Sequence, residues 1–395
     1  MTHPAAPDRP EFHLAPPQGW MNDPNGLCRV GDRWHAYYQF HPYSDVWGPM
    51  HWGHASSTDL LHWHHHPVAL EPDPLGTIFS GSVVQDHDDT AGFGPGALVA
   101  IFTHHAEDRQ HQSVAYSSDG GERWTKYAGN PVLPGEVADF RDPKVRRLAD
   151  GTWSMVVTLR DHLAFFESSD LVHWLPTGEF RCDLATSCGR PTGAWECPDV
   201  VAVPDAHGGI AWLLIISVAE GGPHGRSGTM AVPGMPTNGG FEQTGAPFRM
   251  DHGPDFYAFQ SFWGTGTESL GMAWMASWDD AWVVPSSGWR GVQSLPRRLT
   301  WRGGRLCQWP AAGEWPTFEG DSVVRLAGVG GASVRAGVDH GVAFIERHGG
   351  WTSTYDGRYE APVSSAGPHM VVVDHGTVEV FADNGAVTLS ARVFL

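Results

Sequence analysis

A short motif recurs three times in the first half of the chain and constrains the fold more than any other feature. Ser-x-Asp followed by a tryptophan occupies residues 57–63, 117–124 and 168–174, and the tryptophans stand 61 and then 50 residues apart. Ser and Asp favour tight turns, and a repeat of this length matches one four-stranded blade of a β-propeller. The motif therefore predicts propeller blades. The alternative is that turn residues recur by coincidence in another kind of all-β protein.

Short apolar runs rich in β-branched and aromatic residues occur throughout the chain. Residues 34–40, 97–102, 153–158 and 211–216 are examples, and each is bounded by Gly, Pro or Asp. The 49 Gly and 30 Pro favour turns, and no amphipathic pattern of three helical turns interrupts the runs. The sequence thus predicts an all-β protein built from many short strands.

The charge of the chain excludes some classes of partner. A formal net charge of −19 argues against nucleic acid, which is bound through basic patches. A neutral ligand such as a sugar is compatible with this charge. No apolar run is long enough to span a membrane, so no membrane partner is expected.

The five cysteines are Cys28, Cys182, Cys188, Cys197 and Cys307. Their odd number and the lack of a C-x-x-C spacing argue against a disulfide framework or a zinc site, although Cys182 and Cys188 could pair locally. The N-terminal residues show no signal-peptide pattern. Reduced thiols and no leader predict a cytoplasmic protein, or a secreted one if a leader has been removed.

Three acidic residues lie in short polar segments beside strand-like runs. Asp23 is part of WMNDPNG, Asp142 of FRDPKV and Glu196 of WECPD. A propeller brings the inner strands of separate blades to one central cavity, so acids 119 and 54 residues apart can meet there. Two carboxyl groups flanking a glycosidic bond are the minimum set for glycoside hydrolysis. We therefore expect a sugar-cleaving site.

These three motifs, in this order, resemble the signature of glycoside hydrolase family 32, the invertase and fructanase family. Further segments that resemble the family are residues 37–40, 47–55, 79–82, 255–258 and 289–297, together with VEVFADNG near the C-terminus. The similarity covers roughly residues 11–301.

The resemblance implies a fold and a division of roles. It implies a five-bladed β-propeller catalytic domain over residues 11–301 and a β-sandwich over 306–395. Asp23 would be the nucleophile that attacks C2 of a β-fructofuranosyl unit. Glu196 would be the general acid and then the base, so it must hold a proton near neutral pH. Asp142 would stabilise the transition state, with Arg141 beside it. The residues that would line the fructose subsite are Asn22, Gln39, Trp47, Phe79, Ser80 and Trp278.

The C-terminal segment differs from the rest in pattern and length. After residues 302–330 the strands are shorter and alternate more regularly, as in 377–382 and 387–393, and Asp-Asn-Gly at 383–385 predicts a hairpin between them. Only about 90 residues remain after position 306. We expect a small sandwich, shortened relative to the family's.

Several functions stay open at this point. The leading interpretation is a retaining β-fructofuranosidase acting on sucrose or short fructo-oligosaccharides, as a monomer or homodimer. An exo-fructanase acting on levan or inulin, a fructosyltransferase and a sucrose-6-phosphate hydrolase are alternatives within the family. A sugar-binding propeller without catalysis is the alternative of another class. A related family that cleaves arabinosides and xylosides matches the motifs less well.

A histidine-rich run, His62-Trp63-His64-His65-His66, has the composition of a metal site. Its first residues belong to the repeated turn, and successive side chains on an extended backbone point to opposite faces. The expected glycoside hydrolysis also needs no metal ion. We therefore predict no metal and no cofactor.

Overall fold

The structure is a computed structural model that describes residues 9–107, 109–135, 137–184, 193–349, 354–364 and 367–395. Nearly every regular element in these residues is a β-strand, and the helical turns are three 3₁₀ segments of three residues, Pro223–Gly225, Val329–Gly331 and Asp383–Gly385. The all-β prediction is confirmed. Among these residues no helix is long and apolar enough to cross a membrane.

Five antiparallel sheets follow one another along the chain up to Pro310. They consist of β1 (Gly19–Val30), β2 (Arg33–His41), β3 (His51–Ser57) and β4 (His64–Leu70); β5 (Thr77–Asp86), β6 (Ala97–Ala106), β7 (Arg109–Ser117) and β8 (Thr125–Lys126); β9 (Phe140–Arg147), β10 (Trp153–Leu159), β11 (His162–Ser168) and β12 (Leu175–Phe180); β13 (Trp195–Pro204), β14 (Ile210–Val218), β15 (Gly228–Thr237), β16 (Gly240–Gln243) and β17 (Phe248–Arg249); and β18 (Tyr257–Ser261), β19 (Ser269–Trp274), β21 (Arg297–Arg302) and β22 (Arg305–Pro310).

The first strands of the five sheets form a closed ring. Strand β1 contacts β5, β5 contacts β9, β9 contacts β13, β13 contacts β18, and β18 contacts β1 again. The short strand β20 (Trp289–Arg290) comes from the last part of the ring and pairs in parallel with β1. This cyclic order is that of a five-bladed propeller, which agrees with the blades predicted from the repeat and with the number implied by the family resemblance.

The repeated motif forms the turn between the third and fourth strands of three blades. In the first turn the Ser57 hydroxyl donates to Asp59, whose carboxylate accepts the backbone N–H of His62 at 2.8 Å. Ser168 and Asp170 repeat this arrangement in the third blade. The side chains close the turn by replacing backbone hydrogen bonds, which explains why the same residue types recur in these three blades.

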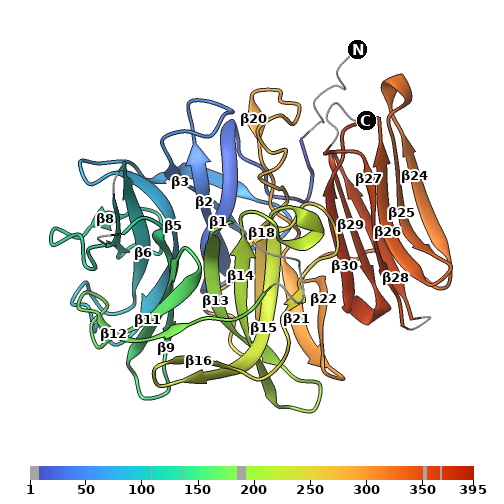
Figure 1. Cartoon of the computed structure of the whole chain (residues 1–395). Helices are drawn as coiled ribbons and strands as arrows, with labels where there is room; N and C mark the ends of the chain where they lie inside the picture. The colour runs from blue at the N-terminus through green and yellow to red at the C-terminus, as the bar shows by residue number, and fades with distance from the viewer. Residues whose placement is uncertain (1–8, 108, 136, 185–192, 350–353, 365–366) are drawn as a thin grey trace.

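The C-terminal part is a sandwich of two four-stranded sheets (Figure 1). One sheet holds β23 (Thr317–Phe318), β28 (His369–Asp374), β29 (Thr377–Ala382) and β30 (Val387–Arg392); the other holds β24 (Ser322–Ala327), β25 (Ser333–Asp339), β26 (Val342–His348) and β27 (Gly357–Pro362). The 3₁₀ turn at 383–385 joins β29 to β30, where the sequence predicts a hairpin. The predicted boundary at 301–306 falls inside the β21–β22 hairpin, so the fifth sheet continues to Pro310. The division into separate folding domains stays a prediction.

A buried arginine joins the sandwich to the propeller. Arg297 on β21 is fully buried and pairs with Asp251 at 3.0 Å and with Glu379 on β29 at 2.5 Å. His13, near the start of the described chain, lies between Glu379 and Asp374, at 3.0 and 2.9 Å. The sheet that contains β28–β30 therefore packs directly against the fifth blade (Figure 1).

Candidate active site

One cavity of about 750 Å³ opens at the centre of the ring. All ten residues that the sequence predicts for the site line it: Asn22, Asp23, Gln39, Trp47, Phe79, Ser80, Arg141, Asp142, Glu196 and Trp278. The acids and their immediate neighbours come from the first residues of β1, β5, β9 and β13, so one end of the ring supplies them. The catalytic roles of these residues stay predictions; the structure supplies their common location.

Each inner strand has an irregular register where it reaches the cavity. The shifts occur at Met21/Pro24 in β1, Ile78/Gly81 in β5 and Glu196/Asp199 in β13, with equivalents in β9 and β18. Bulges of this kind redirect a side chain out of the regular alternation. Proline follows the site residue in Asp23-Pro24 and Asp142-Pro143, and proline is tolerated at a bulge because no ladder hydrogen bond is required there.

Three residues at these bulges have left-handed backbone conformations. Asp142 has a φ of 63°, Cys197 of 49° and Ala258 of 54°. Such angles are uncommon for residues with a side chain and concentrate at functional sites. Asp142 lines the cavity and Cys197 follows Glu196, so two of these angles lie at the predicted acids.

Asp23 is held by donors on both oxygens. Asn22 Nδ2 donates to Oδ1 at 3.0 Å, and the Ser80 hydroxyl donates to Oδ2 at 2.7 Å. Burial raises the pKa of Asp23, the charge of Glu196 raises it further, and the bonds from Ser80 and Asn22 oppose the rise. These donors therefore favour the ionised carboxylate in a site that otherwise disfavours it.

Asp142 shares a neighbour with Asp23. The backbone N–H of Cys197 donates to Asp142 Oδ2 at 2.9 Å, and the Cys197 thiol lies 3.7 Å from that atom and 3.4 Å from Asp23 Oδ2. Burial raises the pKa of Asp142 to about 7; Arg141 opposes the rise, and Glu196 and Asp23 add to it. Two carboxylates thus converge on one thiol, whose own pKa burial raises.

Glu196 is bound on both oxygens by different partners. Arg141 donates from Nη2 to Oε1 at 2.9 Å, and the Tyr257 hydroxyl donates to Oε2. Arg141 also pairs with Asp139 and lies 3.9 Å from Asp142. One guanidinium therefore contacts three carboxylates, and Tyr257, whose pKa burial raises, fixes the acid from the other side.

The segment of β1 that carries Asp23 is held by buried side chains behind it. Trp20 is buried, and its indole N–H donates to Asn22 Oδ1 at 2.9 Å, which turns the Asn22 amide toward Asp23. Gln293, also fully buried, donates from Nε2 to the backbone carbonyl of Asn22 at 2.6 Å. A chain of hydrogen bonds therefore fixes the peptide that carries the predicted nucleophile.

Aromatic rings form one wall of the cavity. Trp278 stacks on Trp282 with ring centroids 5.2 Å apart, and both stack on Trp20. Trp47 contacts Phe79 and Trp282 edge-on at 6.2 and 6.3 Å. Such surfaces suit the apolar face of a sugar ring.

Some residues of the site were not predicted from the sequence. Tyr257 lies in a segment that resembles the family, but the motif alone does not indicate its contact with Glu196. Gln293 donates to a backbone carbonyl, and such a contact requires no particular residue type that a sequence motif could reveal. Asp279 and Trp282 line the cavity from a long loop. The position of Cys197 directly after Glu196 is the only feature of the sequence that indicates its place near the acids.

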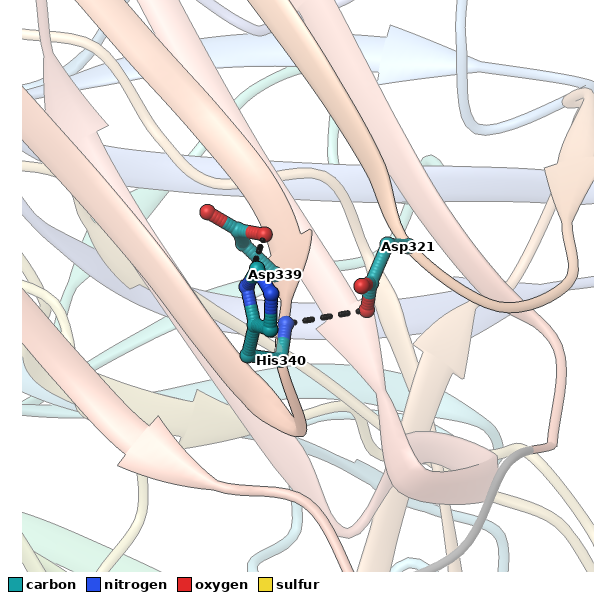
Figure 2. A group of neighbouring side chains, drawn as sticks. All are labelled: Asp321, Asp339 and His340. Atoms are coloured by element: carbon teal, nitrogen blue, oxygen red, sulfur yellow. Dashed lines mark hydrogen bonds and ion pairs between the residues drawn. The ribbon is translucent and has the colours of Figure 1, made fainter.

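A group of three potential metal ligands occurs in the described residues, and it lies in the sandwich. Figure 2 shows Asp321, Asp339 and His340, with the His340 ring bonded to Asp339 at 2.7 Å and its backbone N–H to Asp321 at 2.9 Å. These two hydrogen bonds, at neighbouring ends of β24 and β25, account for the arrangement.

The histidine-rich run forms β4 and the turn before it. His62 bonds to Asp59 in the repeated turn, and His66 stacks on the buried His54 with ring centroids 4.2 Å apart. Burial lowers the pKa of His54 to about 2, so it packs as a neutral ring. Cys188 lies outside the described residues, so its pairing with Cys182 is untested.

The family relationship follows from comparison with known proteins. The family model for the N-terminal domain of glycosyl hydrolases family 32 matches residues 13–310. The chain belongs to glycoside hydrolase family 32. The resemblance identified from WMNDPNG, RDP and WECPD is thereby confirmed.

The chain is similar to proteins named levanase and invertase. It is 42% identical to a levanase of Bacillus subtilis (strain 168) over 332 residues, 80% of this chain and 48% of the levanase. It is 40% identical to an invertase of Debaryomyces hansenii over 312 residues, 75% of this chain and 57% of the invertase. The chain thus spans about half the length of these relatives. A β-fructofuranosidase structure from Schwanniomyces occidentalis, complexed with fructosyl-erythritol, matches with a TM-score of 0.90 at 27% identity, covering 100% of this chain and 93% of that one.

Proposed function

We propose that the chain is a retaining β-fructofuranosidase that cleaves sucrose or short fructo-oligosaccharides. The observation that carries this proposal is the meeting of Asp23, Asp142 and Glu196 in one cavity, with Asp23 held by two hydrogen-bond donors and Glu196 bound by Arg141 and Tyr257. Two carboxyl groups with different partners suit two different roles.

The reaction proceeds in two displacements. Asp23 attacks C2 of the fructosyl unit while the bond from C2 to the leaving oxygen breaks, and Glu196 gives that oxygen its proton. Water then attacks C2 of the fructosyl ester and passes a proton to Glu196, and the bond to Asp23 breaks and restores its carboxylate. Arg141 and Tyr257 hold the Glu196 carboxyl group in place for both transfers. Asp142 stabilises the transition state by binding the sugar hydroxyls.

Variants of the two acids test the proposal. We expect Asp23→Asn and Glu196→Gln each to lower kcat on sucrose by about 10³-fold or more, because each removes a group that forms or breaks a bond. Asp150→Asn, at an exposed turn, is the matched control and should leave kcat unchanged. Near-normal turnover by Asp23→Asn would contradict the assignment.

Product analysis distinguishes the neighbouring activities. Retention predicts that reaction in dilute methanol yields methyl β-D-fructofuranoside, and a panel of sucrose, inulin and levan separates a fructosidase from an exo-fructanase. Titration calorimetry that detects fructose binding by a protein without turnover on the panel would favour a sugar-binding propeller. A cytoplasmic location and a monomeric or homodimeric state stay predictions.

A further inference from the structure

Two loops complete the cavity beyond the residues expected at the fructose subsite. The β14–β15 loop contributes Glu220 and its neighbours, and the β19–β20 loop contributes Asp279 and Trp282. The cavity volume of about 750 Å³ lies within the ~300–1,000 Å³ range of small-molecule sites and exceeds what one fructosyl unit fills. These loops therefore border space for a second unit.

Asp279 is exposed but held in one orientation. Its Oδ2 accepts the Ser277 hydroxyl at 2.6 Å and the backbone N–H of Ser227 at 3.1 Å, and the two serine hydroxyls bond to each other at 2.9 Å. Among the described residues no hydrogen bond reaches Oδ1. A carboxylate fixed by one oxygen presents the other as an acceptor at little further cost in side-chain entropy.

Trp282 presents an indole at the same side of the cavity. It is 44% exposed although it stacks on Trp278 and Trp20. A large aromatic side chain that lines a cavity and remains half in water is typical of a ligand contact. The stack holds the ring in place, so it forms a flat platform beside Asp279.

The charges of the lining select the kind of ligand. Asp23, Asp142, Glu196, Glu220 and Asp279 face the cavity, and Arg141 is the only cation among the described lining residues. That guanidinium already pairs with Glu196. A phosphate ester would therefore meet like charges with no cation to pair with, whereas sugar hydroxyls can donate to the carboxylates.

We propose that Asp279 and Trp282 form the binding site for the sugar unit that leaves, and that this unit is neutral and unphosphorylated. Its hydroxyls donate to Asp279 Oδ1, and its apolar face stacks on Trp282. The inference rests on the proposed function and assigns the substrate class of the same cavity.

The test compares two substrates that differ in the leaving group. Sucrose releases a sugar, and methyl β-D-fructofuranoside releases methanol, which needs no sugar site. We expect Asp279→Asn and Trp282→Ala each to lower kcat/KM for sucrose by about 10-fold, through KM, and to change kcat/KM for the methyl fructoside by less than 2-fold. Val283→Ala, an exposed neighbour outside the cavity lining, is the control and should change neither value.

A charged substrate tests the second half of the proposal. Wild-type kcat/KM for sucrose phosphorylated on its glucose unit should be at least 10-fold below that for sucrose, and Asp279→Asn should narrow this gap. Equal losses on sucrose and methyl fructoside would show that the two residues only support the fold. A preference for the phosphorylated sugar would also overturn the proposal. A wild-type protein inactive on every fructoside would instead contradict the proposed function.

Discussion

The cavity and the propeller–sandwich contact both bury carboxylates, but they shift the pKa values in opposite directions. In the cavity, burial raises the pKa of Asp142 to about 7. At the contact, burial also favours a higher pKa for Glu379, but Arg297 and His13 outweigh it and lower the pKa to about 2. The difference lies in the supply of partners. Arg141 alone pairs with three carboxylates, whereas Glu379 is contacted by two cations, Arg297 and His13, each of which pairs with one further acid, and it also accepts a backbone N–H.

This contrast separates the predicted active site from a contact that holds two parts of the chain together. A carboxylate with complete partners is fixed in its ionised form and contributes to stability over a wide pH range. Asp142, buried beside other acids, has a raised pKa, and shifted pKa values of this kind concentrate at functional sites. The predictions below test each side of the comparison.

The largest effect is expected at the contact. Arg297→Met keeps much of the side-chain volume but leaves Asp251 and Glu379 buried without their cation. We expect the free energy of unfolding to fall by about 3–5 kcal/mol, as measured by urea denaturation at pH 7. A loss below 1 kcal/mol would show that the contact does not depend on this ion pair.

Asp142→Asn should raise the free energy of unfolding near neutral pH, the opposite of the effect expected for Arg297→Met. Because the folded pKa of Asp142 is raised, its contribution to stability is complete below pH 4 and is lost as the pH rises through about 7. Relative to wild type, the variant should therefore gain stability between pH 4 and pH 8, by about 1–3 kcal/mol, while turnover falls. Denaturation curves at several pH values measure the trend; a gain that is largest at pH 4 would refute it.

Gln293→Met tests the brace behind Asp23. Methionine matches glutamine in shape but does not donate to the Asn22 carbonyl. We expect kcat on sucrose to fall about 3–10-fold, with KM within 2-fold, because a hydrogen bond of this kind contributes about 1 kcal/mol. The prediction would be wrong if kcat were unchanged, or if a thermal melt showed that the variant loses activity because it unfolds. Gln293 would then contribute only to packing.

His13→Gln should give the smallest effect. Asp374 and Glu379 overcome the effect of burial and raise the pKa of His13, so its contribution is complete below pH 6.5 and is lost as the pH rises through the higher folded value. We expect the variant to be less stable by about 1 kcal/mol at pH 6 and closer to wild type at pH 9. Thermal melts at the two pH values measure the difference, and a larger loss at pH 9 would reverse the sign.

The sequence predicted the cavity better than its surroundings. Asp23, Asp142 and Glu196 are recognisable because prolines and flanking aromatics accompany them in short local motifs. Asp279 and Trp282 lie on a long loop that has no such pattern, and the Asp279 carboxylate accepts a hydrogen bond from Ser227, 52 residues away in the chain. The Arg297–Glu379 pair spans 82 residues, so only the folded chain shows it. Local motifs reveal chemistry, whereas contacts between distant segments need the fold.

The central claim is that Asp23 forms the covalent bond to the sugar. Wild-type protein quenched with acid during turnover of sucrose and analysed by peptide mass spectrometry tests it most directly. The account predicts one added fructosyl unit on the peptide that contains Asp23, and none on the same peptide of Asp23→Asn. A fructosyl unit on the Asp142 or Glu196 peptide, or active turnover with inversion at C2, would contradict it.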